Sequence, residues 1–471
     1  MRAIARAPVE AVEGAGAIGE ARGVAGRVTA VAGAGAIGEA RGVAGRVTAV
    51  AGAIAFAGFG SRRAHRSPPW CGSAAPRATI RLRLYSPILV DPAVPPRAPR
   101  LVTRSFVLVT VAVFLGALSP NLFVLASRYL ARRGYDPDAI GLVMAAFMVG
   151  SLSTMAWVGR VIQRGHRALA LAAGCAVGAA GCALFERADA LWGFVAARVV
   201  QGSGFAAVLV SGSAYVAEIA PPARLAQALG FAGVLTLAAQ AVGPAFGEWI
   251  VAAAGWRWLF WSGSIAGVAG AALGALLPPI RDGQRAGAAA PPAARATAAV
   301  VAMALSGFGF GSVVGFLAAY ADAASVGAVS PFFTAYVAAA IAARLALGHL
   351  ADTRGRRATA TPALVGHSMA LAVLAALSSP WQLVASGGLY GLCHGIYYPS
   401  LQAQIVERAP ADARARAVAT STLAFGGGAF CAQLGLGVVA NAWGYPAIYA
   451  IAAAAGVAAA GAVWSGPRDF V

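Results

Sequence analysis

The sequence predicts an all-helical integral membrane protein with twelve transmembrane helices. Hydrophobic residues make up 59% of the 471 residues and charged residues only 11%, whereas a soluble domain carries about 25% charged residues. The mean hydropathy is +0.72. Apolar segments repeatedly reach the ~20 residues that a helix needs to cross a bilayer. Such a chain cannot cover a soluble surface, so we expect the lipid bilayer to be its environment.

Membrane topology also explains the basic balance of the chain. The formal net charge is +19, and arginine supplies it because the sequence contains no lysine. In a soluble protein this balance would suggest nucleic-acid binding. Here the arginines lie mainly in short loops and in the first hundred residues, so we expect no nucleic-acid partner. The five cysteines show no CxxC spacing and four fall inside apolar segments, so we expect no metal site and no cofactor.

Residues 1–100 are predicted to be a disordered, low-complexity extension. Residues 14–32 recur unchanged as residues 33–51, and each copy contains a GxGxxG pattern. That pattern binds a pyrophosphate only within a βαβ unit of about 30 residues, and this repeat is too short for such a unit. Residues 61–100 are rich in arginine and proline, which is typical of disordered cytoplasmic sequence. A translation start assigned too far upstream would also produce such a segment.

From about residue 101, long apolar segments alternate with short polar joints. The twelve predicted spans are 105–127, 138–162, 168–187, 190–217, 225–253, 257–278, 297–321, 330–351, 358–378, 381–405, 416–440 and 444–465. The longest joint, 279–296, separates the sixth span from the seventh. We therefore predict two six-helix domains, 101–278 and 297–471, joined by a cytoplasmic linker at 279–296.

The distribution of arginine predicts the orientation of the chain. Counted with the span residues directly next to them, the even-numbered joints carry twelve arginines and the odd-numbered joints five. Because cytoplasmic loops are enriched in arginine, we predict that the even joints and both termini lie inside. The first external joint is an exception, since it carries Arg128, Arg132 and Arg133.

Residues 347–357 form the most informative polar joint. A tight cationic turn between two apolar segments is typical of the cytoplasmic mouth between two membrane helices. The residues that make up the pattern are Gly348, Asp352, Arg354, Gly355, Arg356 and Arg357.

This pattern resembles the loop motif of the major facilitator superfamily, which lies between helices 2 and 3 and recurs between helices 8 and 9. The resemblance covers residues 101–471 and is specifically to the twelve-helix drug and metabolite efflux branch. It implies two six-helix bundles related by a pseudo-two-fold axis along the membrane normal, each built from inverted three-helix repeats.

The resemblance also implies a gating role for this joint. Asp352 would accept hydrogen bonds from a neighbouring helix N-terminus, and the arginines would pair with acidic groups or lipid phosphates while the cytoplasmic side is closed. Arg344, at the inner part of the eighth span, would pair with Asp352 or with a carbonyl. The alternative is a cluster that only orients the helix. The first-half copy, residues 159–167, is degraded: Gln163 stands at the acidic position and Gly165 comes one residue early.

Two residues inside spans are candidates for proton coupling. Arg198 belongs to Arg198-Val-Val-Gln-Gly-Ser-Gly204 on the fourth span, which resembles the family's helix 4 motif. The alternative is an arginine that extends from a helix end to the interface. His394 lies well inside the tenth span and can titrate near neutral pH. The alternative is a histidine that is simply bonded to a neighbouring group.

The fifth span carries Gly243, Pro244 and Gly247, and is similar to the helix 5 motif of antiporters and exporters. Proline removes one helical hydrogen bond, and glycines permit bending and close packing. The alternative is an ordinary kink. Polar side chains on several spans are candidates to line a central cavity: Asn121, Tyr215, Gln240, Tyr397, Tyr398, Gln402 and Gln433.

These observations predict a secondary active transporter, not an enzyme, that exports small organic compounds or drugs in exchange for protons by alternating access. A few polar groups in an apolar cavity suit amphipathic substrates. We expect a monomer in the bacterial inner membrane. The alternatives are an importer of a sugar or organic acid with the same fold, and a membrane sensor that does not transport. No intramembrane acid stands out in the first six spans, which leaves the proton carrier open.

Overall fold

The computed structural model describes residues 101–280, 297–347, 350–410 and 413–466. The predicted extension at 1–100 and nearly all of the predicted linker lie outside these residues, as does Gly348 of the predicted loop motif. The side chain of Asp352 is likewise outside the described part.

The described residues form helices and no strands. In chain order the elements are α4 (Arg104–Leu122), η1 (Phe123–Leu125), α5 (Ala126–Arg132), α6 (Pro137–Gln163), α7 (Arg167–Glu186), α8 (Leu191–Ile219), η2 (Pro222–Arg224), α9 (Leu225–Ala254), α10 (Trp256–Ala275), α11 (Ala298–Ala323), α12 (Ser330–Leu347), α13 (Leu350–Arg354), α14 (Arg356–Ala375), α15 (Pro380–Glu407), α16 (Arg414–Trp443) and α17 (Tyr445–Ser465).

Eleven helical spans in the described residues are long and apolar enough to cross a membrane. The first of these runs through α4, η1 and α5 without interruption, from Arg104 to Arg132. The remaining predicted span corresponds to α15, which has 28 residues and carries more polar side chains. In lipid every backbone hydrogen bond must be satisfied within the protein, and a helix does this within its own segment. The predicted all-helical membrane fold is confirmed.

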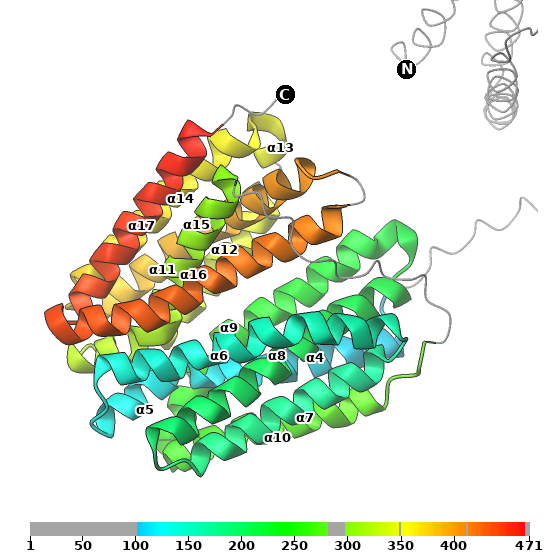
Figure 1. Cartoon of the computed structure of the whole chain (residues 1–471), viewed down its shortest axis with the longest axis horizontal. Coiled ribbons are helices and arrows are strands. Elements are labelled where there is room, and N and C mark those ends of the chain that lie inside the picture. Colours follow the sequence, from blue (N-terminus) through cyan, green and yellow to red (C-terminus); the bar gives the residue numbers. More distant parts are fainter. Residues whose placement is uncertain (1–100, 281–296, 348–349, 411–412, 467–471) are drawn as a thin grey trace, which may run out of the picture. The chain divides into compact units, whose positions relative to one another are not determined.

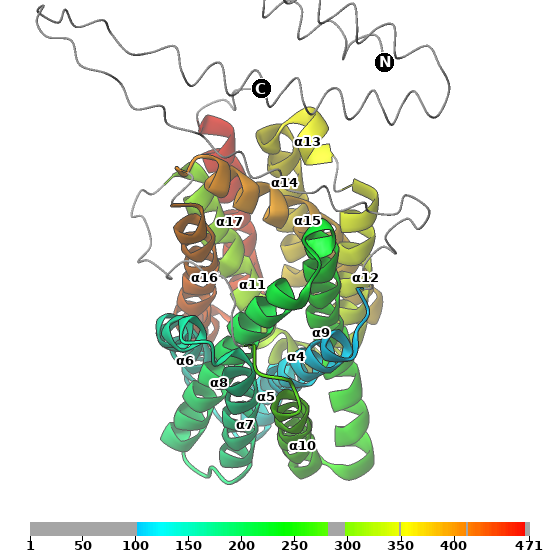
Figure 2. The same ribbon diagram turned by 90° about the vertical axis from the view of Figure 1, so that its right-hand side faces the viewer.

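The helices are grouped into two bundles. Figure 1 shows α4 to α10 together in one bundle and α11 to α17 in the other. Corresponding helices pack on each other in the two bundles: α6 and α7 both pack on α8, and α12 and α14 both pack on α15. Figure 2 shows α13 at the same end of the second bundle as the C-terminal end of α17. We call the two bundles the N-terminal half and the C-terminal half.

Corresponding turns of the two halves use the same residues. A threonine caps the first helix of each half: the Oγ1 atom of Thr103 accepts from the Phe106 amide at 3.2 Å, and that of Thr297 from the Val300 amide at 3.3 Å. Left-handed glycines then recur in matched pairs at three joints, and these pairs are Gly134 with Gly327, Gly165 with Gly355 and Gly255 with Gly444. The halves are therefore structural repeats of one another.

Two predicted boundaries differ from the structure. The first span was expected to end at residue 127, but helix continues to Arg132, so two arginines assigned to a loop lie on a helix. The joint at 347–357 was expected to be a simple turn, but it contains the short helix α13 before Gly355. In both places arginines, which favour helix, extend the structure beyond the apolar run.

Glycines bring α12 and α15 into direct backbone contact. A Cβ atom on Gly391 would lie 2.0 Å from the carbonyl oxygen of Tyr336, which is far inside van der Waals contact. In lipid no hydrophobic force draws helices together, so close packing of small residues holds them. Gly388 lies one turn away on the same helix, and a Cβ atom there would meet nothing within 4 Å.

We therefore expect Gly391→Ala to destabilise the C-terminal half and Gly388→Ala to leave it intact. The added methyl group at position 391 meets backbone, which cannot rotate away, so α12 and α15 must separate. Overpacking of this kind costs about 1–3 kcal/mol. Thermal unfolding of the two purified variants would measure the difference. Equal melting temperatures would show that the two helices tolerate a wider spacing.

Candidate functional site

A cavity of about 460 Å³ lies between the two halves. Four helical segments of the N-terminal half line it (α4 with η1, α6, α8 and α9), and four helices of the C-terminal half do so (α11, α12, α15 and α16). Its volume falls within the ~300–1,000 Å³ range of small-molecule sites. Most of the lining side chains are apolar or aromatic, and a few are polar.

Seven of the residues singled out in the sequence lie around this cavity. Four are cavity candidates and three are candidates for gating or proton coupling. They are Asn121, Gln240, Tyr398 and Gln433, together with Arg198, Arg344 and His394. They come from both halves, although they are far apart in the sequence.

Three predicted cavity residues lie elsewhere. The Tyr215 hydroxyl donates to the carbonyl of Pro278 at 3.0 Å, so this side chain anchors the segment that follows α10. Tyr397 is fully buried and packs against the ring of His367, with ring centroids 5.2 Å apart. The Gln402 amide lies 3.4 Å from the Ser421 hydroxyl, between α15 and α16.

Arg198 is buried in the N-terminal half, with 3% of its surface exposed. Its Nη1 atom donates to the side-chain oxygen of Gln201, whose Nε2 atom donates in turn to the Cys182 sulfur at 3.1 Å. The guanidinium lies over the ring of Phe147 at 4.7 Å. It is therefore held within the membrane by neutral groups and does not extend to the interface.

His394 is buried on the opposite wall. Its Nδ1 atom lies 2.8 Å from the Tyr336 hydroxyl, whereas Nε2 has no hydrogen-bond partner in the described structure. His367, on α14, is a second buried histidine that sequence reasoning missed, and neither of its ring nitrogens has a partner there. His367 does not line the cavity. Its place near the middle of an apolar span was the available signal.

The glycines of the helix 5 motif permit close packing against the first helix. A Cβ atom on Gly243 would lie 2.7 Å from the Cβ atom of Asn121, and one on Gly247 would lie 3.0 Å from the Leu125 side chain. Pro244 lies inside α9, which continues through it. The motif thus places Asn121 and α9 together at the cavity wall.

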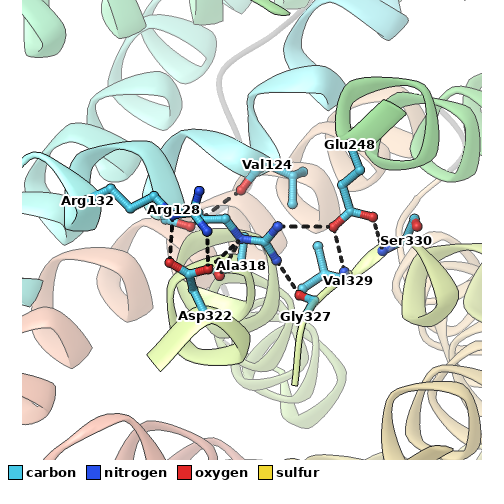
Figure 3. A network of polar contacts seen from close by, with 10 residues as sticks. Val124, Arg128, Arg132, Glu248, Ala318, Asp322, Gly327, Val329 and Ser330 are labelled. Atoms are coloured by element: carbon cyan, nitrogen blue, oxygen red, sulfur yellow. Dashed lines mark hydrogen bonds and ion pairs between the residues drawn. The ribbon is translucent and has the colours of Figure 1, made fainter. Parts of the chain in front are cut away.

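A network of charged residues joins the halves at the end predicted to face outside (Figure 3). Arg128, on α5, lies 3.4 Å from Glu248 of α9 and donates to the carbonyls of Ala318 and Gly327 at 3.2 and 2.6 Å. Arg132 forms a bidentate pair with Asp322 of α11, at 2.9 and 2.6 Å. We call these four charged residues, Arg128, Arg132, Glu248 and Asp322, the external network.

Glu248 extends the network to the start of α12. Its carboxylate accepts from the amides of Val329 and Ser330, at 2.7 and 3.2 Å. The amides at a helix N-terminus have no partner within the helix, and the helix dipole favours an anion there. Glu248 is only 13% exposed. It neutralises Arg128 and caps a helix of the other half.

The halves are closed at this end. Between described residues, the hydrogen bonds and ion pairs that connect the halves all belong to the external network and its backbone partners. Glycines reinforce the closure, since Cβ atoms on Gly141 and Gly437 would lie 2.2 and 2.6 Å from carbonyl oxygens of the opposite half. The sequence held a signal for this closure. Glu248 and Asp322 each lie near the predicted outer end of a span, and the first external joint carries three arginines.

At the other end, each half has an arginine–glutamate pair in the same place. Arg167, at the start of α7, lies 2.8 Å from Glu218 at the end of α8. Arg356, at the start of α14, lies 2.8 Å from Glu407 at the end of α15. The first-half motif, although it lacks the acid, therefore keeps this ion pair, and Gly165 adopts the same left-handed backbone as Gly355.

The remaining residues of the loop motif lie on the same surface. Arg354 is exposed at the end of α13. Arg357 donates to the carbonyl of Gly466 at 3.2 Å and lies over the Trp464 ring at 4.8 Å. These contacts tie the start of α14 to the end of α17.

Two repeated helical bundles around a central cavity, closed at one end by ion pairs, define a membrane transport protein. The model of the Major Facilitator Superfamily matches residues 105–302 and 299–469. The chain belongs to this superfamily, and it is an integral, multi-pass membrane protein.

Individual relatives match shorter segments. The MFS-type transporter TOXA of Cochliobolus carbonum is 29% identical over 154 residues, which are 32% of this chain and 27% of that protein. The putative multidrug resistance protein MdtD of Serratia proteamaculans (strain 568) is 34% identical over 99 residues, 21% of each chain. The chain thus spans about a quarter of the length of these relatives or less.

The fold is similar to that of solved transporters. The crystal structure of the nucleoside transporter NupG superposes with a TM-score of 0.61 at 14% identity, over 77% of this chain and 99% of that one. This similarity concerns the fold alone.

We expect Asp322→Asn to weaken the closure at the external end, because it removes the bidentate partner of Arg132. A partly exposed ion pair is worth up to about 1 kcal/mol, which corresponds to roughly a fivefold change in the population of the closed state. The matched control is Asp189→Asn. Asp189 lies 3.8 Å from Arg133 in an exposed pair within the N-terminal half.

A cysteine at the cavity residue Ser151 would report the change, in a background with Cys71 and Cys431 replaced by serine. Asp322→Asn should speed its reaction with a membrane-impermeant thiol reagent added outside the cell, and Asp189→Asn should not. The same rate in both variants would show that the external network does not control access to the cavity.

Proposed function

We propose that this protein is a secondary active transporter that exports small organic compounds in exchange for protons. The observation that carries the proposal is the cavity shared by two repeated halves, closed at the predicted external end. Such a cavity is accessible from one side only, and separation of the external network together with closure of the opposite end would expose it to the other side. We further propose a monomer in the bacterial inner membrane, with both termini in the cytoplasm.

The resemblance to the efflux branch supports the outward direction, as does the similarity to a putative multidrug resistance protein. The predominantly apolar and aromatic cavity suits compounds that partition into membranes. In such a cavity a small number of polar groups orient the substrate, and Asn121, Gln240 and Gln433 are suitably placed.

His394 is the proposed site of proton exchange. It lines the cavity, and its Nδ1 atom lies next to the Tyr336 hydroxyl. Its Nε2 atom has no hydrogen-bond partner among the described residues and can accept a proton. No carboxylate lines the cavity among the described residues. Histidine changes charge within the pH range that a membrane gradient spans. Arg198 would act on the coupling through the charge it holds in the same cavity.

We expect an inward proton gradient to drive substrate movement in proteoliposomes, with a compound first identified by a growth screen of cells with and without expression. His394→Asn should abolish the response to the gradient while exchange of substrate for substrate continues. The control is His367→Asn, which alters a buried histidine outside the cavity and should keep the response. Flux that ignores the gradient in the unaltered protein would remove proton coupling.

The loop motif is the proposed gate on the cytoplasmic side. Its carboxylate, Asp352, lies on α13, between the end of α12 and the arginines at the start of α14. A carboxylate in this place would favour the conformation that is closed on the cytoplasmic side, because only that conformation would bring it close to a helix N-terminus of the neighbouring segment.

We expect Asp352→Asn to reduce transport several-fold while the protein still inserts into the membrane. A carboxylate at a helix N-terminus is worth roughly 0.3–1 kcal/mol, and its loss would shift the balance between the two conformations. The control is Asp136→Asn, at the opposite end of the protein, where the side chain is exposed. Unaltered flux in the Asp352 variant, with normal protein levels, would refute the gate.

A further inference from the structure

Two arginines of opposite halves face the same cavity. Arg198 comes from α8 in the N-terminal half and Arg344 from α12 in the C-terminal half, and both line it. Among the described residues, the lining contains no aspartate or glutamate. The cavity therefore holds two positive charges and, in this part of the chain, no negative charge to balance them.

Arg198 has only neutral partners in the described structure. One of its Nη atoms donates to an amide oxygen and the guanidinium lies over an aromatic ring. Its Nε atom is buried without a hydrogen-bond partner. Contact with an aromatic face compensates part of the cost of burying a cation, but it leaves the positive charge in place.

Arg344, on the other wall, is half-buried. Its Nε atom is also buried without a hydrogen-bond partner, and no described carboxylate lies within ion-pair distance. The predicted partner of Arg344 was Asp352 or a carbonyl. Its side chain instead points to the cavity, on the wall that also carries Tyr336, Tyr398 and His394.

A buried arginine cannot relieve its cost by losing its proton. The guanidinium stays charged under all conditions in which proteins work, unlike histidine or lysine. An unpaired charge within a membrane protein is expensive, and such residues usually pair with one another or mark a substrate path. In the external network the arginines are paired, since Glu248 balances Arg128 and Asp322 balances Arg132.

We propose that the substrates of this transporter are organic anions, with an apolar or aromatic body and a carboxylate or another oxyanion as head group. The inference rests on the proposed function and names its substrate class. The head group would take the place of the missing carboxylate and accept hydrogen bonds from Arg198 and Arg344 together. Arginine suits this task because its planar fork matches an oxyanion with two parallel hydrogen bonds.

Binding of one anion by both arginines would also couple the substrate to the conformation. Arg198 and Arg344 belong to halves that move relative to each other in alternating access. An anion between them would draw the halves together around the cavity, whereas a neutral compound leaves both positive charges of the lining unbalanced. Export of an anion also moves negative charge outward, which an inside-negative membrane potential favours.

The test uses three compounds of the same shape and different charge: 2-naphthoate, 2-naphthamide and 2-naphthylmethylammonium. Binding to the purified, full-length protein would be measured by equilibrium dialysis. We expect 2-naphthoate to bind at least tenfold more tightly than the amide or the ammonium compound. Binding without preference, preference for the cation, or no binding of any of the three would overturn the proposal.

Variants separate binding by the two arginines from general partition into the protein. Arg198→Gln and Arg344→Gln should each lower the affinity for 2-naphthoate tenfold or more and leave 2-naphthamide unaffected. Arg344→Lys should restore part of the affinity, because it keeps the charge. The control is Arg187→Gln, at an exposed arginine outside the cavity. Equal losses for the anion and the amide would indicate a structural defect and overturn the assignment.

Failure of this inference and failure of the proposed function give different results. If 2-naphthoate binds through both arginines but no flux follows an imposed proton gradient, the substrate class stands and proton-coupled export falls. If a neutral or cationic compound is exported with the gradient and 2-naphthoate does not compete, the transport function stands and the anion proposal falls.

Discussion

A bilayer offers an arginine side chain no water with which to share its charge, and much of this structure depends on how its arginines meet that constraint. At the predicted external end, Arg128 and Arg132 are balanced by Glu248 and Asp322, which come from other helices. These ion pairs do more than offset the cost of placing charges in the membrane protein. Because Asp322 belongs to the opposite half, Arg132 is neutralised only when the halves are together, and only then can Glu248 cap a helix of that half.

The same constraint explains an irregularity in the topology. Three arginines in the first external joint oppose the general rule that arginines gather inside. In the structure two of them lie on the last turns of α5, paired with carboxylates, and the third, Arg133, lies near Asp189 and the Tyr129 hydroxyl. Arginines that pair with carboxylates at a helix end are placed there by those ion pairs, so they are weaker evidence for the orientation of the chain in the membrane.

Repetition of the fold shows which features the two halves need. Both halves keep a capping threonine, left-handed glycines at matching joints, and an arginine–glutamate pair between the third and fourth helices. They differ at the cavity. The N-terminal half contributes Arg198 within a neutral cluster, and the C-terminal half contributes Arg344 and His394. The scaffold is therefore symmetric, while the chemistry of the site is not.

By itself, the sequence was sufficient to determine the class of fold, the division into two groups of six helices and the family. These properties depend on local composition, because each span must be apolar along its own length to cross a membrane. Several residues of the cavity wall, such as Asn121 and Gln433, could also be found, since polar groups stand out in apolar spans.

Tertiary structure decided which charged residues form pairs. Arg128 and Glu248 are 120 residues apart, and Arg132 and Asp322 are 190 apart. No local pattern encodes such pairs, because the first forms where α5 and α9 pack within one half and the second only where the two halves meet. The same packing left Arg198 and Arg344 without a described carboxylate, in one cavity.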